Sequence, residues 1–393
     1  MPTRVRAAVM TAPGAIEVRE FPYPRPEAGA LLLRMVLAGI CGTDKHTFKG
    51  ENVQYAGTEA QCTTPFPIIP GHENLGVVAE LGPDGGRRRD FYGRDLKEGD
   101  RLVMCPDVVC GRCWYCRQVH GYPWCDNVRG YGNAFSATEP PSLFGGWAEY
   151  MYILPNAFVY LVPAGIPDEV AVLAEPFAVT YALDEARESG SALGRGFAAG
   201  DTVVVQGVGP LGLCCVIKAR ILGAGEIVAT DLSDFRLAMA RDFSADHTLS
   251  VRRTEREERI EYARQLTGGR GADLVVGCTS DSRAFTEGLE MLRKGGTYIE
   301  LGNFVDTGPT SINLHRHVVA KNARIIGVTN HPFTGYDASL KLFEKYGGQF
   351  PFARMVTHRY PLAEAEAAMR KSLEEDTMKV VIDPWAEAPG LPG

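Results

Sequence analysis

The stretch TVVVQGVGPLG, residues 202–212, decides the fold of this chain. Its β-branched residues predict a buried strand, and G-x-G-x-x-G follows at Gly207, Gly209 and Gly212 before an apolar helix, Leu211–Leu222. In such a unit the first glycine permits a tight turn and the second lets backbone N–H groups approach a pyrophosphate. The third lets the helix pack closely on the strand. The stretch therefore predicts a dinucleotide-binding loop in a doubly wound α/β fold.

The start of the helix and the next strand complete this loop. Pro210 and Leu211 open the helix, whose free N–H groups and dipole suit phosphates. The predicted strand after it ends at Asp231, 19 residues beyond Gly212, where about 20 is expected for the acid that binds the adenosine ribose. A carboxylate repels a 2′-phosphate, so the pattern favours NAD over NADP. Arg236 leaves NADP open, because a guanidinium there stacks on adenine or accommodates a phosphate.

The chain has two parts with different sequence patterns. The first 160 residues read as short strands separated by Gly and Pro turns, whereas strands alternate with helices from Asp201 to about Val328. We therefore expect an α/β plus β protein: a β-rich catalytic domain over residues 1–180, a cofactor domain over 181–330, and a return to the first domain over 331–393. The predicted strands of the cofactor domain are Thr202–Gln206, Ile227–Thr230, Leu274–Gly277, Thr297–Leu301 and Arg324–Gly327. The predicted helices are Asp168–Arg187, Leu211–Leu222, Arg236–Phe243, Glu255–Leu266 and Ser282–Leu292.

Composition excludes several classes of protein. The 393 residues are 45% hydrophobic and carry a net charge of −7, which argues against a nucleic-acid partner because a duplex-binding face needs clustered Lys and Arg. There is no run of 18 apolar residues and no N-terminal apolar segment, so we expect no membrane partner, no signal peptide and a cytoplasmic location.

Ten cysteines are present, and four of them cluster. Cys110, Cys113 and Cys116 form C-x2-C-x2-C, and Cys125 follows. In a reducing compartment such a cluster indicates a metal site more than disulfides, and four thiolates suit a closed, structural zinc site. We expect this lobe to occupy about residues 105–130; a set of free thiols is the alternative.

A second metal site is predicted from scattered residues. Cys41 lies in Gly39-Ile-Cys-Gly-Thr-Asp44, His72 and Glu73 in Pro70-Gly-His-Glu73, and Glu175 in Ala174-Glu-Pro-Phe177. Mixed Cys, His and Glu ligands suit a zinc ion that keeps a coordination position open for water or substrate. Spacing alone does not establish this site, since a lone Cys or His is more often structural.

These motifs, in this order, resemble the zinc-dependent medium-chain dehydrogenase/reductase superfamily, in particular its sorbitol and threonine dehydrogenase-like branch. The resemblance runs from about Arg4 to Pro384 and includes the terminal Lys379-Val-Val-Ile382. It implies a GroES-like catalytic domain, a Rossmann cofactor domain, and two zinc ions per chain together with NAD.

The resemblance also assigns roles by position. Cys41, His72 and Glu175 match the catalytic zinc ligands, and Glu73 matches a carboxylate that serves as an alternative ligand. Thr43 matches the hydroxyl that contacts the alcohol, and Asp44 matches a carboxylate that orients the histidine ligand. His46 matches the outer end of a proton relay. The backbone of Leu301-Gly302 matches the segment that faces the nicotinamide carboxamide.

Three departures from the family pattern stand out. Cys125 lies one residue later than usual, so the loop before it should bulge. The segments 52–65 and 85–97 look long, and the first lies between two ligand motifs, where it can cover a substrate cleft. The segment 188–199 also looks extended.

The implied activity is NAD-linked interconversion of a secondary alcohol and its ketone, with a polyol, sugar, cyclitol or hydroxy-amino acid as substrate by family analogy. A bulky cyclic or terpenoid alcohol is an alternative, since Phe48, Tyr55 and Phe66 offer an apolar cleft. A zinc-free NADPH quinone or alkene reductase and a non-enzymatic dinucleotide-binding protein are the other rivals. By the same analogy we expect a homodimer or homotetramer joined through the stretch Thr297–Ile326.

Overall fold

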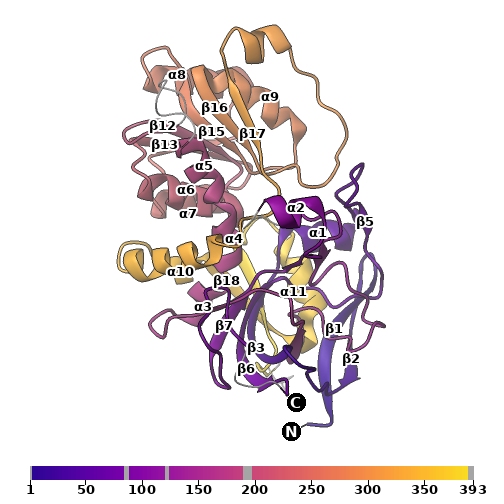
Figure 1. Cartoon of the computed structure of the whole chain (residues 1–393). Helices are drawn as coiled ribbons and strands as arrows, with labels where there is room; N and C mark the ends of the chain where they lie inside the picture. Colours follow the sequence, from indigo (N-terminus) through magenta and orange to yellow (C-terminus); the bar gives the residue numbers. More distant parts are fainter. Residues whose placement is uncertain (1, 84–87, 120–123, 189–196, 388–393) are drawn as a thin grey trace, which may run out of the picture. The chain divides into compact units, whose positions relative to one another are not determined.

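The computed structural model describes residues 2–83, 88–119, 124–188 and 197–387. It divides into two units, one of Met1–Ala178 with Pro332–Gly393 and one of Val179–His331 (Figure 1). The expected bulge before Cys125, the first three residues of the segment 85–97 and most of the segment 188–199 lie outside the described residues.

The second unit is built on a six-stranded parallel sheet, which confirms the predicted doubly wound fold. The strand order is β14-β13-β12-β15-β16-β17, so the chain reverses direction across the sheet between β12 and β15. Ligands of such sheets bind at this switch point, outside the carboxyl ends of the strands. The strands are β12 (Thr202–Gln206), β13 (Glu226–Asp231), β14 (His247–Ser250), β15 (Ala272–Gly277), β16 (Leu292–Glu300) and β17 (Arg324–Gly327).

Helices connect these strands. They are α5 (Tyr181–Glu188), α6 (Pro210–Ile221), α7 (Asp234–Asp242), α8 (Arg256–Leu266), α9 (Ser282–Met291) and a π-helical turn, η3 (Leu314–Val319). Helix α7 begins earlier than predicted because the Ser233 side chain caps it, accepting a hydrogen bond from the Arg236 N–H group. Strand β14 is absent from the prediction because its sequence, HTLS, is short, polar and at the sheet edge.

The first unit contains a seven-stranded mixed sheet, ordered β11-β7-β6-β3-β19-β18, with β10 paired to β3. Residues from the C-terminal segment complete it, since β19 pairs with β3 at Val381 opposite Gly39. The chain thus returns to the unit in which it began. The strands are β3 (Leu31–Gly39), β6 (Glu73–Leu81), β7 (Arg101–Met104), β10 (Tyr150–Ile153), β11 (Val159–Leu161), β18 (Val356–Pro361) and β19 (Lys379–Asp383).

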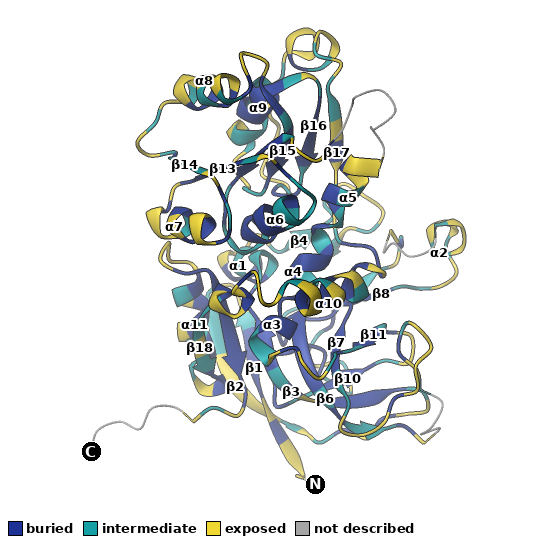
Figure 2. Ribbon diagram, turned by 90° about the vertical axis from the view of Figure 1, so that its left-hand side faces the viewer, coloured by how far each residue is buried: buried dark blue, intermediate teal, exposed yellow. Residues whose placement is uncertain are grey.

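Three two-stranded sheets and short helices surround that sheet (Figure 2). The small sheets are β1 (Arg4–Ala12) with β2 (Ala15–Pro22), β4 (Val53–Gln54) with β5 (Cys62–Thr63), and β8 (Asp107–Val108) with β9 (Arg129–Gly130). The helices are α1 (Gly42–Lys49), α2 (Trp114–Gln118), α3 (Asp168–Ala171), α4 (Ala174–Val179), α10 (Gly335–Tyr346) and α11 (Ala365–Ser372), with 3-10 turns at Phe352–Met355 and Leu362–Glu364.

The prediction of one continuous helix over Asp168–Arg187 is wrong. The structure divides it into α3, α4 and α5, with breaks on both sides of Ala174–Val179. Pro176 lacks the N–H group that would continue the helical ladder back to Val172, which explains the first break. This break makes Glu175 a residue of the first turn of α4.

Among the residues that the structure describes, none of the helices combines the length and the hydropathy that crossing a bilayer requires.

Candidate metal centres and cofactor loop

Cys41 lies at the junction of a strand and a helix. It follows β3 and is the N-cap residue of α1, with extended backbone at φ −97°. The Asp44 carboxylate accepts a hydrogen bond of 2.9 Å from the Cys41 N–H group, and the Cys41 side chain accepts one from the third residue of the helix. This reciprocal cap fixes the direction of the Cys41 thiol.

His72 is buried and directly precedes β6, the strand that pairs with β3. Its Nδ1 atom is 3.8 Å from Asp44 Oδ1, and among the described residues it has no hydrogen-bond partner at normal distance. Burial opposes a charge on this imidazole, yet the neighbouring Cys41 and Asp44 outweigh burial and hold the pKa of His72 well above its usual range. The site therefore favours positive charge, as a metal-ion site requires.

Glu73 is the first residue of β6 and forms a buried ion pair that the sequence did not reveal. Lys379, at the start of β19, donates hydrogen bonds of 2.5 and 2.6 Å to the two Glu73 carboxylate oxygens and one of 3.2 Å to the Ile40 carbonyl. Burial raises the pKa of the Glu73 carboxyl, and the Lys379 ammonium opposes that rise.

Gly39 makes room for this pair. It stands opposite Glu73 in the β3–β6 ladder, and a Cβ atom on it would lie 1.9 Å from Glu73 Oε2. Because the Lys379 ammonium occupies both oxygens of Glu73, this carboxylate is already neutralised in the structure. The one signal in the sequence was a lysine heading an otherwise apolar strand, Lys379-Val-Val-Ile382.

Glu175 completes the predicted catalytic set from a third element, α4. Its half-buried carboxylate interacts electrostatically with His72, Glu73 and Lys379, so the fold brings it to the same region. The ligand atoms of Cys41, His72 and Glu175 do not all lie within 4.8 Å of one another in the described residues, so at least one pair is farther apart. A thiol, an imidazole and a carboxylate are nevertheless a donor set that suits an open zinc site.

Thr43 and His46 occupy successive turns of α1, three residues apart, and therefore lie on one side of the helix. Both side chains are half-buried. The imidazole Nδ1 of His46 makes a short contact with Glu51 Oε2. Asp44, between them in sequence, is instead buried and turned toward Cys41 and His72.

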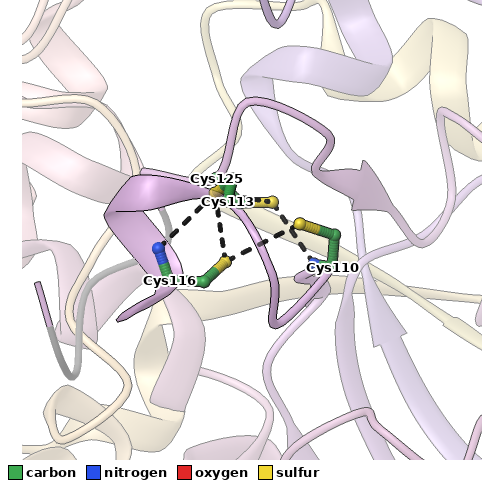
Figure 3. A group of neighbouring side chains, drawn as sticks. All are labelled: Cys110, Cys113, Cys116 and Cys125. Atoms are coloured by element: carbon green, nitrogen blue, oxygen red, sulfur yellow. Dashed lines mark hydrogen bonds between the residues drawn. The ribbon is translucent and has the colours of Figure 1, made fainter. Parts of the chain in front are cut away.

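The four clustered cysteines converge in the structure (Figure 3). Their sulfur atoms all lie within 4.8 Å of one another, with separations of 3.4 Å for Cys113–Cys116 and 4.0 Å for Cys110–Cys116 and Cys113–Cys125. Sulfur atoms bound at about 2.3 Å to one tetrahedral zinc ion stand about 3.8 Å apart. The observed separations bracket that value, so the four thiols fit a zinc ion.

Among the described residues from Cys110 to Cys125, only Cys125 is buried. Helix α2, which carries Cys116, has no buried residue, and Trp114 and Trp124 are 64% and 46% exposed. Burial raises the pKa of the Cys125 thiol, and the backbone N–H groups of Cys110 and Asn127, each donating a 3.3 Å hydrogen bond to Cys125 Sγ, oppose that rise. A segment without a hydrophobic core needs such a cross-link to stay folded.

The glycine loop lies between β12 and α6 at the switch point of the sheet. Gly207 has φ +82°, and a Cβ atom on Gly212 would lie 1.9 Å from the Gly207 carbonyl oxygen, so both positions require glycine. Gly209 is the N-cap residue of α6 and supplies no side-chain hydrogen bond, while Pro210 occupies the first turn. The N–H groups at the N-terminus of α6, around Leu211, are thus left for a ligand's phosphates.

Asp231 ties this loop to the end of β13. Its Oδ2 accepts a 2.8 Å hydrogen bond from the Val208 N–H group, and its Oδ1 accepts one of 2.8 Å from Ser233. Each carboxylate oxygen retains a lone pair for a ribose hydroxyl. The Arg236 Nη1 atom lies 3.9 Å from where a Cβ atom on Gly209 would stand, so the guanidinium borders the loop.

Leu301 and Gly302 follow β16 at the same end of the sheet. The Leu301 N–H group donates to the Gly277 carbonyl, and the Gly302 N–H group donates to the Glu300 carboxylate, each at about 2.8–2.9 Å. A Cβ atom on Gly302 would lie 2.2 Å from the Thr279 carbonyl oxygen. This close packing places the Leu301-Gly302 backbone beside the turn after β15.

Comparisons with known proteins agree with this fold. Residues 27–164 match the alcohol dehydrogenase GroES-like domain, and residues 210–345 match the zinc-binding dehydrogenase domain. The chain is 35% identical over 382 residues to 5-exo-hydroxycamphor dehydrogenase of Pseudomonas putida, covering 96% of this chain and 98% of that protein. It is 28% identical over 387 residues to sorbitol dehydrogenase of Bacillus subtilis, covering 98% of each.

A solved structure gives the same result. The crystal structure of an alcohol dehydrogenase from Thermotoga maritima matches with a TM-score of 0.86 and 32% identity, covering 97% of this chain and all of that one. A GroES-like domain joined to a six-stranded Rossmann sheet, matched by both family models, defines a zinc-dependent oxidoreductase. The chain belongs to the zinc-binding medium-chain dehydrogenases, the zinc-containing NAD(P)-dependent alcohol dehydrogenase family.

Proposed function

We propose that this enzyme interconverts a secondary alcohol and its ketone, with one catalytic zinc ion, one structural zinc ion and NAD. The observation that carries the proposal is the buried His72 imidazole between Cys41 and Asp44, at the ends of two adjacent strands. A buried imidazole flanked by a thiol and a carboxylate has the chemistry of a metal ligand and of its orienting partner.

Cys41, His72 and Glu175 would hold the catalytic zinc ion, and Cys110, Cys113, Cys116 and Cys125 the structural one. When bound, a catalytic zinc ion polarises the alcohol oxygen and lowers the pKa of its hydroxyl, and a nicotinamide accepts hydride. Asp44 would orient His72 through Nδ1. Lys379 holds Glu73 in an ion pair, which leaves the third ligand position to Glu175 in the resting enzyme.

Two residues of α1 would carry the proton that the alcohol releases. Thr43 would accept the hydroxyl proton, and His46, one turn further toward the C-terminus of the helix, would hold a proton on its way to solvent. General acid–base catalysis of this kind contributes about 10²–10⁴-fold to a rate. A protein that only bound dinucleotides would have no use for such a pair beside a metal site, and a zinc-free reductase would need neither ligand set.

The cofactor loop supports NAD over NADP. The Asp231 carboxylate is buried, faces the glycine loop and would repel a 2′-phosphate. Arg236 borders the same loop and would contact the adenosine end of the cofactor.

The substrate class is proposed from chemistry and relatives together. Sorbitol and 5-exo-hydroxycamphor, named for two relatives, each carry a secondary hydroxyl, so a secondary alcohol is the common denominator. Our first candidate is a polyol, sugar, cyclitol or hydroxy-amino acid, for which a zinc site with a carboxylate ligand, Glu175, suits chelation.

A bulky cyclic alcohol is the second candidate, supported by the 35% identity to the hydroxycamphor enzyme. The aromatic cleft expected from the sequence rests on Phe48, Tyr55 and Phe66. Phe48 is buried in the core beneath the Arg370 guanidinium, so it is structural. Tyr55 and Phe66 are half-buried, and Phe66 packs against the same core.

We also propose that the enzyme is a homodimer or homotetramer joined through the edge of the second unit's sheet. Strand β17 is an edge strand, and Ile325 on it is 40% exposed. Leu314 and Val319, on the preceding π-helical turn, are each 65% exposed. An edge with apolar side chains at it suits pairing with a second copy. Sedimentation analysis tests this directly.

A substrate screen tests the activity. Purified enzyme is incubated with NAD or NADP and with representative polyols, cyclitols, hydroxy-amino acids and bicyclic alcohols, and the reduced nicotinamide is followed by its absorbance. We expect zinc-dependent turnover, abolished by chelation and restored by zinc, with NAD preferred. No turnover on any of these alcohols would contradict the proposal.

A further inference from the structure

Beyond the predicted relay residues, a carboxylate from outside α1 reaches His46. Helix α1 ends at Gly50, which has φ +92° and donates its N–H group toward the carbonyls of His46 and Thr47. This left-handed turn sends the chain back along the helix, so the Glu51 N–H group donates a 2.9 Å hydrogen bond to the His46 carbonyl. The Glu51 side chain then contacts the His46 imidazole.

The contact has a defined direction. It joins Glu51 Oε2 to His46 Nδ1, and the side chains are 50% and 17% exposed respectively, so the pair leads from a half-buried ring to solvent. A carboxylate at Nδ1 keeps the proton on that nitrogen, which makes Nε2 the acceptor nitrogen of the neutral ring. A ring in this tautomer is ready to accept a proton at Nε2.

We propose that Glu51 is a positioning residue for proton release, an inference that rests on the proposed function. Glu51 fixes the tautomer of His46 and stabilises the imidazolium that forms when a proton from the alcohol reaches Nε2. The proton leaves the alcohol oxygen through Thr43, the oxygen keeping the electron pair, and an N–H bond forms at Nε2 while the Nδ1–H group stays hydrogen-bonded to Glu51. The Nε2–H bond then breaks as that proton passes to water, which restores the neutral ring. The Glu51 carboxylate acts through His46 and touches neither the alcohol nor the cofactor.

Local structure alone does not account for this arrangement. The Gly50 turn and the backbone hydrogen bonds of residues 50 and 51 would form with any residue at position 51. The Glu51 side chain is needed only for the negative charge beside His46 Nδ1. Substituting the side chain therefore separates the proton function from the fold of the turn.

The test compares Glu51→Gln and Glu51→Ala with the wild-type enzyme. Glu59→Gln, an exposed carboxylate in the same loop, is the matched control. We expect both Glu51 variants to lose kcat for alcohol oxidation by roughly 10- to 100-fold, less than the 10²–10⁴-fold of a whole acid–base catalyst. KM, zinc content and NADH binding should stay near wild-type values, and Glu59→Gln should stay active.

Acetate provides a readout that a structural role would not move. Added acetate should restore kcat to Glu51→Ala, where it can occupy the vacated space, and not to Glu51→Gln. Unchanged kcat in Glu51→Gln, or a change confined to KM, would overturn the inference even if Glu51→Ala fails to fold. Wild-type enzyme without zinc-dependent activity would instead overturn the proposed function, and the inference with it.

Discussion

The two candidate metal centres of the first unit are built in opposite ways. The cysteine lobe takes all its candidate ligands from one short segment, Cys110–Cys125, in which Cys125 is the one buried residue that the structure describes. The proposed catalytic site takes Cys41, His72 and Glu175 from three elements and lies among buried residues. The lobe would thus depend on its metal for structure, whereas the catalytic site depends on the sheet for its geometry.

Charge distinguishes the two centres further. At the catalytic site a buried cation, Lys379, already balances one carboxylate, Glu73. In the lobe the described cysteines are surrounded by backbone N–H groups and by no buried cation. A site that performs chemistry needs its charge tuned by neighbours; a closed structural site needs only four thiolates.

The largest expected effect falls on the catalytic centre. Cys41→Ser should reduce kcat by at least about a thousandfold, because several kcal/mol of charge stabilisation by the metal would be lost. Since the cofactor loop belongs to the other unit, NADH binding, measured by fluorescence titration, should change little. Retention of full activity would show that the catalytic centre lies elsewhere.

Breaking the buried ion pair should cost stability at this centre and not at the lobe. Lys379→Met leaves the Glu73 carboxylate buried without its cation, so we expect a loss of about 3–5 kcal/mol in the free energy of unfolding. Urea denaturation measures it. The double variant Lys379→Met with Glu73→Gln should recover much of that loss. Equal stability of the single variant and the wild type would show that Glu73 finds another partner.

Removing the partner of the histidine ligand should have a smaller effect. Asp44→Asn keeps the size of the side chain and removes the charge near His72 Nδ1, so zinc affinity at the catalytic centre should fall about 10- to 100-fold. Competition with a chromogenic chelator measures it. The lobe zinc serves as the internal reference, and loss from both centres would point to general unfolding.

The smallest expected effect is the pH dependence of the lobe. The backbone N–H group of Arg112 is the main cause that lowers the pKa of the Cys110 thiol to about 6. Because this pKa is depressed, the metal-free Cys110 thiol is ionised above about pH 6 and takes up a proton as the pH falls through and below that value. Burial raises the pKa of Cys125, so Cys110 is the cysteine at which protons compete least with zinc at neutral pH. Zinc release followed by a metallochromic dye should therefore be flat between pH 8 and 7. Release beginning above pH 7 would contradict this account.

Sequence patterns predicted those parts of the molecule whose contacting residues are close together in the sequence. The glycine loop, its strand and helix, and the cysteine lobe each lie within a short segment whose spacing reflects backbone geometry. Strand β14 escaped prediction because its polar edge sequence carries no periodicity, and the break before α4 required weighing Pro176 against the helical pattern.

Residues brought together by the sheet could not be predicted in the same way. Lys379 is far from Glu73 in sequence and meets it only because β19 and β6 flank β3. Glu51 reaches His46 through a left-handed glycine whose conformation the sequence leaves open. Family resemblance supplied roles for Cys41, His72 and Glu175, but it said nothing about these two charged partners.

Zinc stoichiometry tests the central claim most directly. Metal analysis of the wild-type enzyme, Cys41→Ser and Cys113→Ser should give two, one and one zinc ions per chain. Turnover should disappear in Cys41→Ser, while Cys113→Ser should keep the catalytic zinc and lose resistance of the lobe to proteolysis. One zinc ion or fewer in the wild type, or two in Cys41→Ser, would contradict the account of two separate centres.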